Sequence, residues 1–106
     1  MAMEELEQRG EANVKVIETL LRESFKGTDI VLGDSPLEGR KFKIAAENGN
    51  MFLCVSREYL NDQDESSVRK DFDNQNVART LLSHPGEYFL LCKRGLQPIS
   101  ASNAAS

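Results

Sequence analysis

Residues 40–57, RKFKIAAENGNMFLCVSR, give the clearest structural signal in the chain. Two runs that contain apolar residues flank Asn48-Gly49, a pair preferred in two-residue type I′ turns. In the first run, Phe42 and Ile44 alternate with lysines, which is typical of a strand with one buried face. The second run, MFLCV, is apolar on both faces and indicates a central strand or one covered on both sides. Together these runs predict a β-hairpin around which the rest of the fold is built.

The segment before this hairpin predicts a long amphipathic helix over residues 3–26, followed by a strand. The apolar residues of the helix share one side when the sequence is wound at about 100° per residue. These residues are Met3, Leu6, Val14, Val16, Ile17, Leu20, Leu21 and Phe25. Gly27 follows at the position where a left-handed residue ends many helices, and Gly10 lies on the apolar side, where another backbone can approach. The β-branched run TDIVLGD, residues 28–34, then predicts a strand.

The segment after the hairpin predicts helices and one further strand. Residues 66–84 have a helical pattern whose apolar residues change sides near residues 73–76, so that one kinked helix and two helices both fit. After a turn, residues 88–92, YFLLC, predict a strongly apolar strand. Residues 98–106, PISASNAAS, are small and mostly polar, and we expect them to form a disordered tail.

The expected elements follow in the order α-β-β-β-α(α)-β. Because short turns join the first three strands, we expect an antiparallel sheet with helices packed on one face, which is an α+β fold. The chain has 106 residues, a length typical of one domain. We therefore place a single α+β domain at residues 1–97 and a disordered C-terminal tail at residues 98–106. The order of the strands in the sheet stays open.

Composition and charge narrow the classes of function. The N-terminal residues MAMEELEQRG are acidic, unlike a secretory signal, and no apolar run approaches the ~20 residues of a membrane span. We therefore expect a cytoplasmic protein in which the two cysteines are reduced. The net charge of −4 disfavours a nucleic acid as the main partner. The sequence contains no glycine-rich nucleotide-binding motif, so we expect no cofactor.

Two cysteines are the candidates for nucleophilic or redox chemistry. Cys54 and Cys92 lie within apolar runs, where a thiol is expected to pack in the core and is disfavoured as a thiolate. The core is therefore the expected place for both side chains. A thiol-dependent enzyme is an alternative function, and it would use Cys54 or Cys92 with Arg57, Glu58 and Tyr59 nearby.

The spacing of the acidic residues in one loop resembles that of the ligands in a calcium-binding loop. Asp62, Asp64 and Asp73 stand at positions 1, 3 and 12 of a calcium loop counted from Asp62. However, Ser67 replaces the glycine that the sharp turn of such a loop needs, and Lys70 would place a cation beside the ion. We therefore expect no metal here and predict that these carboxylates begin a helix, whose positive N-terminal dipole they suit.

The order α-β-β-β-α is similar to that of double-stranded-RNA-binding domains. That family relies on a lysine-rich start of its second helix to span phosphates. In this chain Arg69 and Lys70 stand in the corresponding helix, with Asp71 and Asp73 beside them. The resemblance implies a nucleic-acid-associated domain as a second alternative function.

Our leading hypothesis is a small non-catalytic domain that acts through protein–protein contacts as a homodimer. The helix at 3–26 and the strands at 51–55 and 88–92 carry more apolar surface than one thin layer of helices readily covers. Exposed contiguous apolar surface generally marks an interface, although the same residues also fit a simple core. Where the second hairpin strand emerges, the contact candidates are Arg57, Glu58 and Tyr59.

Overall fold

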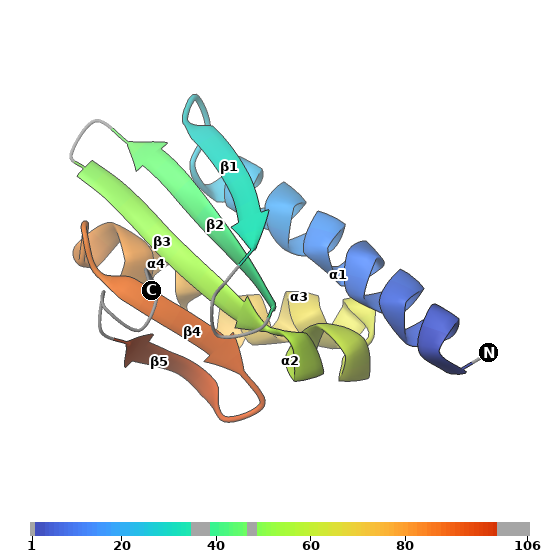
Figure 1. The fold of residues 1–106 in the computed structure, drawn as a ribbon. Coiled ribbons are helices and arrows are strands. Elements are labelled where there is room, and N and C mark those ends of the chain that lie inside the picture. The colour runs from blue at the N-terminus through green and yellow to red at the C-terminus, as the bar shows by residue number, and fades with distance from the viewer. Residues whose placement is uncertain (1, 35–38, 47–48, 100–106) are drawn as a thin grey trace.

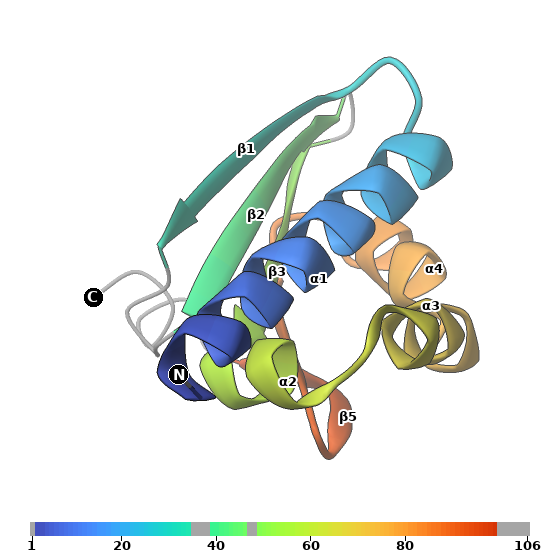
Figure 2. The same cartoon turned by 90° about the vertical axis from the view of Figure 1, so that its right-hand side faces the viewer.

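A computed structural model describes residues 2–34, 39–46 and 49–99, with side chains from residue 10 onward except at residue 34. Its elements are α1 (Ala2–Ser24), β1 (Asp29–Asp34), β2 (Gly39–Ala46), β3 (Gly49–Ser56), α2 (Arg57–Asp62), α3 (Glu65–Asn74), α4 (Val77–Ser83), β4 (Tyr88–Cys92) and β5 (Gly95–Ile99). The helices lie on one face of a five-stranded sheet (Figure 1 and Figure 2). The predicted α+β class is confirmed.

The strands lie in the sheet in the order β1-β2-β3-β4-β5. The first three form the predicted antiparallel meander, and Ala46 pairs with Gly49 where the hairpin closes. Asn48 of the predicted turn lies outside the described residues, as do residues 35–38 between β1 and β2. The expectation of an antiparallel sheet needs one correction, because β4 pairs with β3 in parallel. Three helices carry the chain back to the starting end of β3 before β4 begins, which is the connection that a parallel pair requires.

The hydrophobic core lies between the sheet and the helices. Alternate residues of the central strands point into it, because successive side chains of a strand face opposite sides. The sheet contributes Phe42, Ile44, Met51, Leu53, Val55, Phe89 and Leu91, and the helices contribute Val14, Ile17, Leu21, Val68, Phe72, Val77 and Leu81. The run MFLCV is the third of five strands, so the prediction of a central strand is confirmed.

The short helix α2 was not predicted, since its residues were interpreted as the end of a strand. Ser56 caps it, with its hydroxyl oxygen accepting a hydrogen bond from the main-chain N–H of Tyr59 at 3.2 Å. Asn13 of α1 completes the other end by donating from Nδ2 to the main-chain oxygens of Leu60 and Gln63, at 2.8 and 2.7 Å. Both Tyr59 and Leu60 are buried and belong to the hydrophobic core.

The helical segment that follows divides into two helices, α3 and α4, with the break inside the predicted range. Asp64 begins α3, and its Oδ1 accepts a hydrogen bond from the main-chain N–H of Ser67 at 2.7 Å. The predicted helix start at the acidic loop is therefore confirmed. Asn76 separates the helices with a left-handed conformation, φ 51°, which asparagine adopts more readily than most residues.

The strand β5 was also not predicted. Pro98 and Ile99, which we assigned to a disordered tail, form the end of this strand, and residues 100–106 lie outside the described residues. Pro98 has no main-chain N–H, yet β5 pairs only with β4 and lies at the sheet edge, where proline is tolerated. Gly95 begins the strand with φ 102°, directly after a two-residue turn that follows Cys92.

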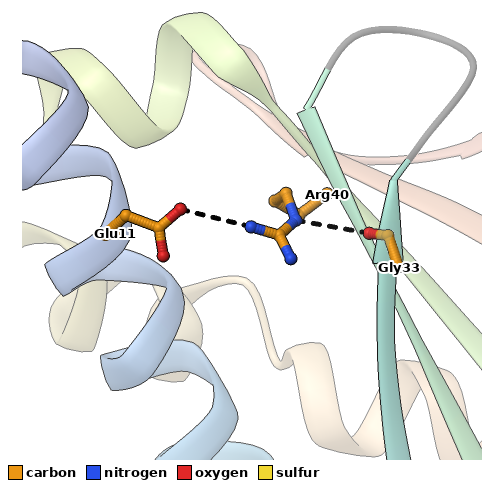
Figure 3. A network of polar contacts seen from close by, with 3 residues as sticks. All are labelled: Glu11, Gly33 and Arg40. Atoms are coloured by element: carbon orange, nitrogen blue, oxygen red, sulfur yellow. Dashed lines mark hydrogen bonds and ion pairs between the residues drawn. The ribbon is translucent and has the colours of Figure 1, made fainter.

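A polar contact joins α1 to the outer part of the sheet. The guanidinium of Arg40 in β2 donates from one terminal nitrogen to Oε1 of Glu11 at 3.3 Å (Figure 3). Its Nε also donates to the main-chain oxygen of Gly33 in β1 at 3.4 Å. Because the Glu11 carboxylate is exposed, this ion pair adds little stability, and its main effect is to orient Arg40 between the helix and the sheet edge.

Candidate functional site

The sheet has a second face, opposite the helices, and no helix of the described residues lies on it (Figure 2). Side chains that alternate with those of the core point to this side. We call it the open face, and it consists of Asp29, Val31, Gly33, Lys41, Lys43, Ala45, Asn50, Phe52, Cys54, Ser56, Tyr88, Leu90, Cys92, Gln97 and Ile99. All five strands contribute to it.

One row of the open face crosses the whole sheet. Val31, Lys43, Phe52, Tyr88 and Ile99 are successive register partners from β1 to β5. The rings of Phe52 and Tyr88 stack with their centroids 4.1 Å apart and their planes 11° from parallel. Val31 is 59% exposed, which is high for a large aliphatic side chain. We call these five residues the aromatic row, and four of them are apolar or aromatic.

A second row runs beside the aromatic row. Lys41, Cys54, Leu90 and Gln97 are its successive register partners from β2 to β5. The charged side chains of the open face are Lys41 and Lys43 on β2 and Asp29 on β1, which together carry a net charge of +1, whereas the whole chain carries a net charge of −4. The charge of this face is opposite in sign to that of the molecule as a whole, and it is confined to one side of the aromatic stack.

A shallow pocket adjoins the end of the aromatic row. It has a volume of about 220 Å³ and is lined by Gly86, Glu87, Tyr88, Pro98 and Ile99. The main-chain N–H of Gly86 donates to the oxygen of Asn50 at 2.7 Å, which fixes the start of β4 against β3. The pocket is small and lies between a strand and its edge neighbour, so it extends the open face but does not enclose a ligand.

The two cysteines occupy different positions. Cys54 has no exposed surface, as expected of a thiol in the core, but it lies on the open-face side of β3. Cys92 is partly buried, and its Sγ donates a weak hydrogen bond to the main-chain oxygen of Gly95 at 3.6 Å. Tyr59, a neighbour suggested for an enzyme site, packs on the helix side of the sheet. The structure thus separates Cys54 from Tyr59 by the thickness of the sheet.

The three contact candidates differ in exposure. Arg57 and Glu58 are exposed at the start of α2 and stay candidates for contact with a partner. Tyr59 is only 1% exposed, so the expectation that it is available to a partner is corrected. Its hydroxyl donates to Oδ2 of Asp71 in α3 at 2.7 Å. Burial, together with this hydrogen bond and the negative charge of Asp71, raises the pKa of the Tyr59 hydroxyl, which therefore stays protonated at neutral pH.

A second contact joins α2 to the turn between β4 and β5. The ammonium group of Lys93 forms an ion pair with Asp62, and this pair, with Glu58 also nearby, raises the pKa of Lys93. Both side chains are about half exposed, so the pair contributes little to stability. Asp62, which would be the first ligand of the calcium loop considered above, therefore forms an ion pair with Lys93 of the same chain.

The residues that suggested nucleic-acid or metal binding are placed as follows. Arg69 and Lys70 are exposed on α3. Asp71 and Asp73 follow them on the same helix, and Asp71 accepts a hydrogen bond from the Tyr59 hydroxyl. Within the described ranges, no three His, Cys, Asp or Glu side chains are grouped so that they could hold a metal ion.

Comparison with known proteins gives no further identification. No family model, curated protein or solved structure matches this chain. Among the described helices, none combines the length and the apolar character needed to cross a membrane. The function must therefore be argued from the surface itself.

Sequence reasoning missed the open face as a site, although part of the signal was present. Lys41 and Lys43 alternate with the core residues of β2, and this pattern already assigned them to the side away from the core. What could not be predicted was that Phe52 and Tyr88 lie next to each other, because their contact depends on the parallel pairing of β3 with β4.

Proposed function

We propose that this chain is a small, non-catalytic cytoplasmic domain that acts through protein–protein contacts, and that it forms a homodimer through the open face. The observation that carries the proposal is the aromatic row. Four of its five register partners are apolar or aromatic, with Lys43 between Val31 and Phe52, and Val31 is 59% exposed. Contiguous apolar surface of this kind generally marks an interface.

The chemistry of the row suits a reversible contact. Aromatic side chains provide large, rigid contact area and are enriched at interfaces. Phe52 and Tyr88 are already stacked on each other, so little rotamer freedom remains to be lost when a partner covers them. Lys41 and Lys43 keep the face soluble when no partner is bound, because charged side chains limit unspecific association.

Sedimentation equilibrium of the purified chain at micromolar concentrations tests the proposal. We expect a monomer–dimer equilibrium. Val31→Lys places a cation within the aromatic row, so we expect it to weaken association by about tenfold or more, which corresponds to ~1.4 kcal/mol. Leu82→Lys is the matched control, since Leu82 is 58% exposed but lies on α4 and not on the sheet.

The outcomes separate the alternatives. A monodisperse monomer over the whole concentration range would refute the homodimer. Equal weakening by Val31→Lys and Leu82→Lys would show that the chain dimerises through another surface. The nucleic-acid alternative instead requires salt-sensitive binding to long duplex RNA or DNA, and the absence of binding at low salt would eliminate it.

A further inference from the structure

We draw no further inference here: the strongest candidate, the outer edge of β1 at Asp29–Asp34, where Val31 is 59% exposed and no proline protects the strand, carries nothing because nothing in the described part of the chain shows what covers it.

Discussion

The side-chain amide of Asn13 in α1 donates hydrogen bonds to the main-chain oxygens of Leu60 and Gln63 at the end of α2, at 2.8 and 2.7 Å. The last carbonyl oxygens of a helix have no partner within the helix. Asn13 is fully buried, and its own Oδ1 has no hydrogen-bond partner in the described part of the chain. A residue near the start of the sequence thus completes a helix that follows the three-stranded meander in the sequence and packs against α1 on the same face of the sheet (Figure 2).

We expect Asn13→Ala to lower the free energy of unfolding by about 2–3 kcal/mol. The substitution removes both donors and leaves the oxygens of Leu60 and Gln63 without a partner, and each unsatisfied buried group costs about 1–3 kcal/mol. Urea unfolding followed by circular dichroism measures the change. Asn74→Ala, at the exposed end of α3, is the control and should change stability by less than about 0.5 kcal/mol. Equal effects of the two substitutions would contradict this role of Asn13.

The hydrogen bond from Tyr59 to Asp71 predicts a dependence of stability on alkaline pH. Because the pKa of Tyr59 is raised in the folded state, its contribution is fully present below the unfolded pKa of about 10 and is lost as pH rises further. We expect Tyr59→Phe to reduce stability by about 1–2 kcal/mol at pH 8. The difference from wild type should shrink above about pH 10, as measured by urea unfolding at a series of pH values.

Tyr88→Phe is the control for this pH series, since Tyr88 lies partly exposed on the open face and not in the core. A difference between wild type and Tyr59→Phe that stayed constant from pH 8 to pH 11 would show that folding does not raise the pKa of the Tyr59 hydroxyl.

Gly10 and Asn61 form a coupled pair. A Cβ atom at Gly10 would lie 2.6 Å from Oδ1 of Asn61, so alanine at this position forces the Asn61 side chain to move. Alanine also favours the helix by about 1 kcal/mol over glycine. We therefore expect Gly10→Ala alone to give little or no gain, and Gly10→Ala in an Asn61→Ala background to stabilise by about 1 kcal/mol. A double-mutant cycle in urea measures the coupling, and strict additivity would contradict the contact.

The cysteines should differ in their rates of alkylation. Cys54 has no exposed surface and Cys92 is partly buried, so iodoacetamide should modify Cys92 first and Cys54 only after unfolding. Mass spectrometry of tryptic peptides over time gives both rates. Rapid modification of Cys54 in the native protein would restore the thiol-dependent enzyme as a serious alternative. Cys92→Ser provides the control that isolates the Cys54 reaction.

The hairpin was predictable because Phe42 and Ile44 alternate with lysines on one side of the turn, and a periodicity of two depends on local sequence alone. The helix α1 was predictable for the same reason, with a periodicity of 3.6. These features need only neighbouring residues to define them.

The features that were missed depend on distant residues or on unusual local chemistry. β5 contains Pro98, and proline argues against a strand unless the strand is known to lie at an edge. α2 has six residues, too few for a helical pattern to be recognised, and it depends on Asn13 for its last hydrogen bonds. The open face depends on the parallel pairing of β3 with β4, which no local pattern specifies.

The parallel pairing of β3 with β4 affects the order in which the parts of the sheet form during folding. The contacts of the meander and of the β4–β5 hairpin join residues that are close in the sequence, whereas Phe52 and Tyr88 come together only after three helices have been placed. Distant pairings bear a larger loss of chain entropy before any contact compensates for it. We therefore expect the sheet to grow as two separately nucleated pieces that close along one line late in folding. Pulse-labelled amide exchange would then show the amides between β2 and β3 protected before those that join β3 to β4.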